Sequence, residues 1–303
     1  MKFEKSTRVY IAGAGGMLGK AVFERFGALA EVMATDIDVN ENWLCYADVR
    51  VFSDIARSIR DFRPHVVLNL AALTDLEYCE RHEEDSYLTN ALGAENVGLV
   101  ANELDIPYVY ISTAGIFGGE KDEYTDFDVP TPLCVYAKSK LAGEQWVVRS
   151  VRKHFVVRAG WMMGGGPDKD KKFINKIYKQ LAAGKRLLHV VDDKLGCPTY
   201  TRDFAAGLQK LLESDLFGLY NQVGGGSGSR FDVATEFVRL LKLADAVRVE
   251  RVDSTFFTSD YFAPRPASEK LLNTKLQARG LNVMRDWKEC LAEYVREFPP
   301  LGP

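Results

Sequence analysis

The sequence predicts an α/β fold: a Rossmann-type doubly wound parallel sheet with a smaller, interleaved C-terminal substrate-binding lobe. Short apolar runs rich in Val, Ile, Leu and Tyr alternate with helical segments over residues 1–160. This alternation is typical of a parallel sheet with helices on both faces. A glycine-rich turn, GAGGMLG at 13–19, follows the first apolar run and opens the first helix, as in dinucleotide-binding folds.

Each element is expected from its local pattern. Continuous runs of β-branched and aromatic residues predict strands, and apolar residues that recur every three or four positions predict helices. The expected strands are 8–13, 31–36, 65–72, 107–113, 154–160 and 218–225. The expected helices are 17–29, 51–64, 85–104, 136–150, 173–184, 201–213, 232–242 and 286–298, and the stretch 164–172 is expected to be a mobile loop that closes over the substrate.

The domain boundaries follow from the loss of this alternation after Trp161. Residues 1–160 are expected to form the NAD(P)-binding domain, which also takes back residues 197–224. Residues 161–196 and 225–303 are expected to form the substrate-binding lobe. We see no internal repeat and no clean linker between the two parts.

Composition narrows the functional class. The chain has 303 residues, 27% of them charged, and a net charge of −3, with no dense basic patch for nucleic acid. The five cysteines have wide spacings and the four histidines show no ligand spacing, so we expect reduced thiols and no metal site. No apolar run is long enough to span a membrane, and the expected location is the cytoplasm. The basic run at 169–172 is interpreted as a solvated loop.

The glycine turn predicts a pyrophosphate site. Gly13, Gly16 and Gly19 stand at three-residue spacing, and a helix opens inside the motif at Met17 and Leu18. Glycines allow the tight turn, the close approach of a pyrophosphate and close packing of the helix on the strand. The free N–H groups at the start of the helix then face the phosphates.

Asp36, seventeen residues after Gly19 and at the end of the second strand, is expected to bind the adenosine ribose. A carboxylate there repels a 2′-phosphate, so NAD (NADH) is the expected cofactor and NADP the alternative. Asp38 competes for this role, and Asp36 could instead cap a loop. Asp48 and Val49 could flank the adenine, or form an ordinary surface turn.

The catalytic candidates are a hydroxyl, a phenol and an ammonium. Ser112 and Thr113 end the fourth expected strand, and Tyr136 and Lys140 lie four residues apart on one helix face. Reduction of a ketone needs a hydride on carbon and a proton on oxygen. The ammonium and a cationic nicotinamide are expected to lower the pKa of the phenol, while Thr113 holds the carbonyl oxygen. A chance pair on a wet helix is the alternative.

Several motifs together resemble a known family. The glycine turn, NLAALTD (69–75), ISTAGIF (111–117) and YAKSKLAGE (136–144) resemble the extended short-chain dehydrogenases/reductases. RAGWMMG (158–164), DDKLGCPT (192–199), GLYNQVGGG (218–226) and RPASEKLLNTKL (265–276) are similar to the dTDP-4-dehydrorhamnose reductase branch of that family.

The resemblance implies a cytosolic NAD(P)H-dependent enzyme that reduces the 4-keto group of a nucleotide-linked deoxysugar. It implies that Tyr136 is the acid, Lys140 its partner and Thr113 the carbonyl clamp. The resemblance further implies a cofactor role for Ala71 and Ala72, and substrate contacts for Thr74, Ser112, Trp161, Pro198 in the GCPT loop, and Arg265. A homodimer is also expected, because homodimers are common for enzymes of this size.

The chain departs from that branch at Ala114 and Gly115, where the branch usually has Asp and an aromatic residue. The small pair leaves the sugar open. It also argues against the related 4,6-dehydratases, which carry an Asp–Glu pair there. Two other functions stay open: a nucleotide-sugar epimerase with tightly bound NAD, and a regulatory subunit like that of methionine adenosyltransferase. Arg265 could also be only a surface ion pair.

Overall fold

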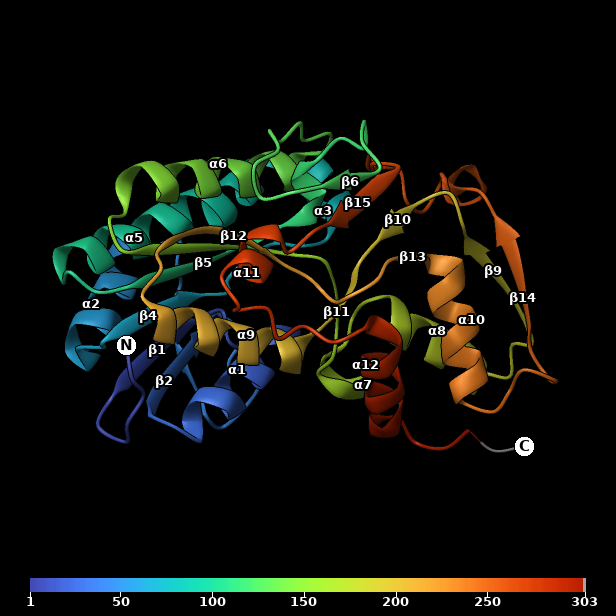
Figure 1. Ribbon diagram of the computed structural model, residues 1–303, viewed down its shortest axis with the longest axis horizontal. Helices are drawn as coiled ribbons and strands as arrows, with labels where there is room; N and C mark the ends of the chain where they lie inside the picture. Colours follow the sequence, from blue (N-terminus) through green and yellow to red (C-terminus); the bar gives the residue numbers. More distant parts are fainter. Residues whose placement is uncertain (302–303) are drawn as a thin grey trace.

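The computed structural model describes residues 1–301 and contains one seven-stranded parallel sheet (Figure 1). Its strand order is β12-β7-β5-β4-β1-β2-β3. The order reverses beside β1, and open α/β sheets bind ligands at the carboxyl ends of the strands near such a point. The doubly wound sheet predicted from the sequence is confirmed. Its strands are β1 (Arg8–Ala12), β2 (Glu31–Asp36), β3 (Leu44–Tyr46), β4 (Val66–Asn69), β5 (Tyr108–Thr113), β7 (His154–Ala159) and β12 (Gly218–Gln222).

Both faces of this sheet are buried. Val9 and Ile11 of β1 belong to one apolar cluster, whereas Tyr10 and Ala12 belong to a second cluster on the opposite face. Successive residues of a strand point to opposite faces. A strand buried on both sides therefore needs apolar residues at every position, which explains the continuous apolar runs.

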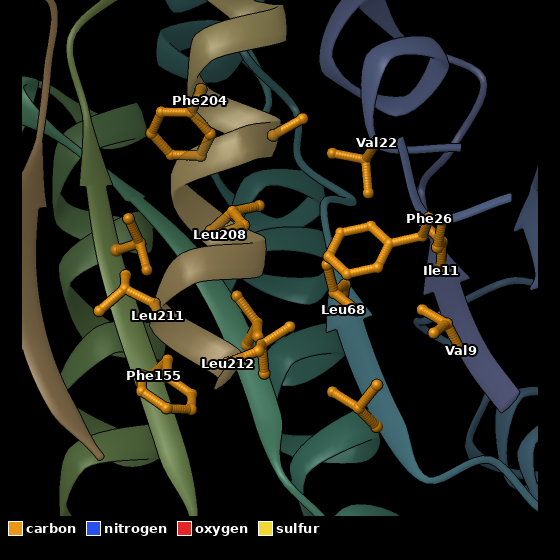
Figure 2. Close-up of a cluster of buried hydrophobic side chains, with 14 of the residues drawn as sticks. Val9, Ile11, Val22, Phe26, Leu68, Phe155, Phe204, Leu208, Leu211 and Leu212 are labelled. Atoms are coloured by element: carbon orange, nitrogen blue, oxygen red, sulfur yellow. The ribbon is translucent and has the colours of Figure 1, made fainter. Parts of the chain in front are cut away.

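Helices cover the two faces. On one face, α1 (Met17–Gly27) and α9 (Thr201–Ser214) contribute Phe26 and Phe204 to a cluster with strand residues (Figure 2). On the other face lie α2 (Phe52–Phe62), α5 (Gly93–Glu103) and α6 (Val135–Ser150). None of the helices within residues 1–301 combines the length and the apolar character that a membrane crossing requires.

The helix expected at 85–104 is divided. Helix α4 (Glu83–Tyr87) leads into a π-helical turn, Leu88–Leu92, and then into α5. The wide turn carries Asn90, whose side chain is fully buried and hydrogen bonds both backbone groups of Leu73 and the Ser139 hydroxyl. Asn90 thereby joins this helix to the loop after β4 and to α6. A period of 3.6 residues does not reveal such a turn.

The C-terminal lobe has its own core, and the sequence analysis missed several short strands outside the large sheet (Figure 1). These strands have two to five residues, too few for a repeated apolar pattern to mark them. They are β6 (Glu123–Tyr124), β8 (Trp161–Met163), β9 (Leu187–Val191), β10 (Leu195–Gly196), β11 (Pro198–Tyr200), β13 (Gly228–Ser229), β14 (Arg248–Val252) and β15 (Ser268–Leu271). The remaining helices are α3 (Leu76–Arg81), α7 (Gly166–Lys169), α8 (Phe173–Ala182), α10 (Arg230–Leu240), α11 (Thr274–Ala278) and α12 (Trp287–Tyr294), with 3-10 turns at Ala114–Ile116, Ser254–Phe257 and Val295–Glu297.

The sequence analysis expected a loop at 164–172, but the structure shows that this stretch is not a plain loop. It contains the short helix α7, and the side chain of Asp170 behind it is buried. Asp170 accepts hydrogen bonds from the Tyr294 hydroxyl at 3.0 Å and from the Lys172 backbone at 2.6 Å. This buried carboxylate anchors the segment to the C-terminal lobe, and the sequence around it gives no sign of that contact.

Phe204 tests how far the large sheet depends on α9. Its side chain is fully buried between α9 and the sheet. We expect Phe204→Ala to lower the free energy of unfolding by about 3–5 kcal/mol, the usual cost of truncating a buried phenylalanine. Leu216→Ala, at an exposed position just after α9, should change it by less than about 0.5 kcal/mol. Equal effects in urea denaturation would show that α9 does not stabilise the sheet.

Candidate active site

A cavity of about 880 Å³ runs along the carboxyl ends of β1, β2, β4, β5 and β7. It lies where the sequence analysis expects the ligand. Fifteen of the expected site residues line it, and Trp161, Pro198 and Arg265 do not. The fifteen are Gly13, Gly16, Met17, Leu18, Gly19, Asp36, Asp48, Val49, Ala71, Ala72, Thr74, Ser112, Thr113, Tyr136 and Lys140.

The glycine turn has the geometry that a bound pyrophosphate needs. Gly13 has φ +74°, and a Cβ on it would overlap the Ala71 backbone. A Cβ on Gly19 would overlap Ala14, so this glycine allows the turn to lie against α1. Gly16 begins α1 without a side-chain cap. The first N–H groups of the helix therefore have no side-chain partner at the cap and can donate to phosphate oxygens.

Asp36 lies beside this turn. Its carboxylate accepts hydrogen bonds from the Gly15 N–H at 2.8 Å and the Asp38 N–H at 3.0 Å. Each carboxylate oxygen can accept further bonds, so Asp36 remains able to bind a ribose. Asp38, the competing candidate, also lines the cavity but accepts from Asn40 in its own loop.

Two basic residues near Asp36 were missed by the sequence analysis. Arg50 lines the cavity and forms a two-pronged ion pair with Asp48, with a shortest distance of 2.7 Å, which lowers the pKa of the Asp48 carboxyl. Lys169, in the run interpreted as a solvated loop, also lines the cavity and pairs with Glu41 at 2.9 Å. Asp48 therefore orients Arg50, and both cations already have acidic partners.

Thr113 and Tyr136 lie side by side at the other end of the cavity. Burial raises the pKa of the Tyr136 phenol, the neighbouring Thr113 side chain partly offsets this, and the negative charge of Glu269 adds to the rise in pKa. This differs from the expectation that Lys140 lowers that pKa. Burial is the largest influence on the pKa of this phenol, and Lys140 is not among the groups that shift it.

Lys140 is 3% exposed, with its ammonium 4.1 Å from the centre of the Tyr110 ring. Burial lowers the pKa of Lys140 to about 7, and the Glu144 carboxylate one turn along α6 only partly opposes this. A lysine poised near neutral pH can take up or release a proton in the working range.

A buried network behind these residues went unpredicted. Glu144 accepts a hydrogen bond from Ser112 at 2.6 Å and forms a two-pronged ion pair with Arg158, with a shortest distance of 2.5 Å. Ser112 was expected to contact substrate, but its hydroxyl points to Glu144. An arginine in the apolar strand HFVVRA was the available signal, because a charge there needs a buried partner.

Trp161, Pro198 and Arg265 do not line the cavity. Trp161 and Pro198 are register partners in the parallel pair β8–β11. The indole N–H of Trp161 donates to Glu269, and the Arg230 guanidinium lies 3.8 Å from its ring centre. Arg265 donates to Glu77 at 2.7 Å, the ion pair considered in the sequence analysis. Their contacts with substrate stay predictions.

Over residues 7–299 the chain matches the family described as "RmlD substrate binding domain". The chain belongs to this family. The spore coat polysaccharide biosynthesis protein SpsK of Bacillus subtilis is 31% identical over 294 residues, which cover 96% of this chain and 98% of SpsK. The predicted membership of the dTDP-4-dehydrorhamnose reductase branch is confirmed.

Solved structures of RmlD relatives share the whole fold. The dTDP-4-dehydrorhamnose reductase of Bacillus anthracis, in complex with NADP, has a TM-score of 0.87 and 29% identity, and the match covers 98% of this chain and 100% of that chain. The dTDP-4-dehydrorhamnose reductase of Yersinia enterocolitica has a TM-score of 0.86 and 32% identity, with 97% and 100% covered.

Lys140→Met tests the buried ammonium. In the folded protein the pKa of Lys140 is about 7, below the ordinary 10.5. The buried ammonium therefore destabilises the fold by its full amount below pH 7, and this destabilisation decreases as the pH rises towards 10.5. We expect the variant to be more stable than wild type at pH 6. That advantage should shrink above pH 7 by up to about 1.4 kcal/mol per pH unit. Lys138→Met, exposed on the same helix, is the control in thermal unfolding across pH.

Asp36→Asn tests cofactor choice. The amide keeps the size of the side chain but removes the charge that repels a 2′-phosphate. We expect the NADPH affinity to rise relative to NADH by about fivefold or more, because like charges 4 Å apart repel by about 1 kcal/mol even in bulk water. Fluorescence titration measures both, with the exposed Asp61→Asn as control. Wild-type protein that binds NADPH more than about tenfold tighter than NADH would contradict this role.

Proposed function

We propose that this protein is an NAD(P)H-dependent reductase of a 4-keto nucleotide-sugar, of the dTDP-4-dehydrorhamnose reductase type. The observation that carries the proposal is the placement of Thr113, Tyr136 and Lys140 in one cavity with the glycine turn. Relatives named dTDP-4-dehydrorhamnose reductase match nearly the whole chain. The uncapped start of α1 and the close-packed Gly13 fit a dinucleotide at the opposite end of the cavity.

The chain's own residues handle the proton. When bound, the dinucleotide supplies a hydride to the carbonyl carbon. Thr113 and Tyr136 hold the carbonyl oxygen between two hydroxyls, and the phenol transfers its proton to that oxygen as the alcohol forms. The high pKa of the buried phenol keeps the proton on Tyr136 until the oxygen acquires negative charge. Lys140, with a pKa of about 7, is a second titratable group and lies one helical turn from Tyr136.

Tyr136→Phe tests this assignment. The variant removes one hydroxyl and keeps the ring, so folding and cofactor binding should persist. Turnover should fall by about 10²–10⁴-fold, the usual contribution of a positioned general acid. The assay is the loss of nicotinamide absorbance with a panel of 4-keto nucleotide-sugars and either NADH or NADPH. Tyr178→Phe, in which the hydroxyl removed bonds the backbone of Pro299 far from the cavity, is the control.

The same assay separates the alternatives. An epimerase retains its cofactor, so nicotinamide fluorescence that survives desalting, with no net oxidation, would replace reduction by epimerisation. A regulatory subunit would show no turnover with any sugar on the panel. A Tyr136→Phe enzyme that keeps more than about a tenth of wild-type turnover would remove the phenol from the mechanism.

We further propose a cytoplasmic enzyme that forms homodimers. All five cysteines are free thiols, and four of them are buried, which fits a reducing compartment. Leu99 on α5 and Val148 on α6 are exposed large apolar side chains, and pairing of these two helices across a two-fold axis would cover them. Light scattering of the purified protein would measure the oligomeric state directly.

A further inference from the structure

Strand β15 brings a carboxylate beside the catalytic pair. Gly115 leaves a small space next to its Cα, and three groups surround the point at which a Cβ would stand there. Glu269 Oε1 lies 3.1 Å from that point, Thr113 Oγ1 lies 3.5 Å away, and Tyr136 Cε1 lies 3.8 Å away. The absence of a side chain at Gly115 therefore lets a carboxyl group from the C-terminal lobe face the groups expected to hold the substrate carbonyl.

The two oxygens of this carboxylate differ. Oε2 accepts the indole N–H of Trp161, and that ring is held between Gly196, where a Cβ would overlap it, and the Arg230 guanidinium. Oε1 has no hydrogen-bond donor among residues 1–301. Glu269 is partly exposed and lies at the edge of the cavity, beside Thr113 and Tyr136, which line it. The structure therefore fixes the orientation of the carboxylate and leaves one oxygen available.

Burial and the nearby charges act in opposite directions on the Glu269 carboxyl, and the net result is a raised pKa. Burial raises the pKa of its carboxyl, while the Trp161 hydrogen bond and the positive charges of Arg230 and Arg265 lower that pKa. Arg230 itself forms no salt bridge with any carboxylate of residues 1–301. A partly buried, oriented acceptor without a donor carries a desolvation cost, which a ligand donor would remove.

We propose that Glu269 reads the substituent on C3 of the sugar, accepting a hydrogen bond from an O–H or N–H group there. This inference rests on the proposed function, in which Thr113 and Tyr136 hold the oxygen at C4. The two carbons next to that carbonyl are C3 and C5. C5 carries the exocyclic carbon and has no donor, so C3 is the neighbour that can offer one. Glu269 is then a specificity-determining residue rather than part of the proton transfer.

Binding of the alcohol product tests this without any turnover. The probes are dTDP-rhamnose and its 3-deoxy and 3-amino derivatives, titrated by calorimetry with NAD⁺ present. We expect wild type to bind the 3-hydroxy sugar about 10- to 100-fold tighter than the 3-deoxy sugar, the range for a hydrogen bond to a charged group. Glu269→Ala should lose most of that ratio. Glu123→Ala, an exposed carboxylate on the neighbouring strand β6, should keep it.

The 3-amino sugar identifies the donor. Tighter binding of the amine than of the hydroxyl, in wild type but not in Glu269→Ala, would assign an ammonium partner. The reverse order would assign a hydroxyl, and both results support the proposal. An unchanged ratio of 3-hydroxy to 3-deoxy affinity in Glu269→Ala would overturn it.

A second variant separates recognition from support of Trp161. Trp161→Phe removes the indole N–H but leaves the carboxylate. If Glu269 only anchors the indole, Trp161→Phe will lose the same ratio as Glu269→Ala, and the proposal fails. If Glu269 reads C3, the carboxylate remains in Trp161→Phe, so this variant keeps part of the 3-hydroxy preference that Glu269→Ala loses, although the loss of the indole tether reduces it. Turnover assays test the proposed function separately. An active enzyme that does not discriminate at C3 supports the reductase function and rejects the role of Glu269. Discrimination at C3 without turnover supports the role of Glu269 and rejects the reductase function.

Discussion

The buried ion pair between Glu144 and Arg158 is the interaction on which the geometry of the site depends. Arg158 belongs to β7 and Glu144 to α6, and Ser112 at the end of β5 donates to the same carboxylate. Ser112 precedes Thr113, and Glu144 lies one turn from Lys140 on helix α6, which also carries Tyr136. One carboxylate therefore fixes the strand that carries Thr113 relative to the helix that carries Tyr136 and Lys140. Removing one partner would leave a buried charge uncompensated, which is strongly destabilising.

The same interior sets the protonation of Tyr136 and Lys140. Burial raises the pKa of Tyr136 and lowers that of Lys140, so both groups favour their neutral forms. The charge of Glu144 is already shared with Arg158, which explains why it only partly restores the ammonium of Lys140. Burial of these two groups reduces the stability of the free protein near neutral pH. It also shifts their pKa values, as is common at functional sites.

Much of the sheet and the cofactor end of the site could be predicted from the sequence, because both depend on local patterns. The glycine turn, Asp36 after β2, and the Tyr136–Lys140 spacing each lie within one or two consecutive elements. The unpredicted parts depend on pairings that no local pattern marks. Glu144 and Arg158 lie in consecutive elements, but their pairing depends on how α6 packs against β7, and the pairing of Lys169 with Glu41 depends on distant segments. The basic run at 169–172 reads as solvent-exposed until the fold places it against the cavity.

Ala114 and Gly115 show how a local departure from a family pattern can mislead. By sequence, the small pair only removes an acid and an aromatic residue from the end of β5. In the structure Ala114 is buried, and the space beside Gly115 is faced by Glu269 from β15. A carboxylate therefore does lie beside Thr113 and Tyr136, but it comes from β15 and is tethered by Trp161. Under the role proposed for Glu269, substrate choice depends on how β15 pairs with β6 and β10, and not on the strand-end motif alone.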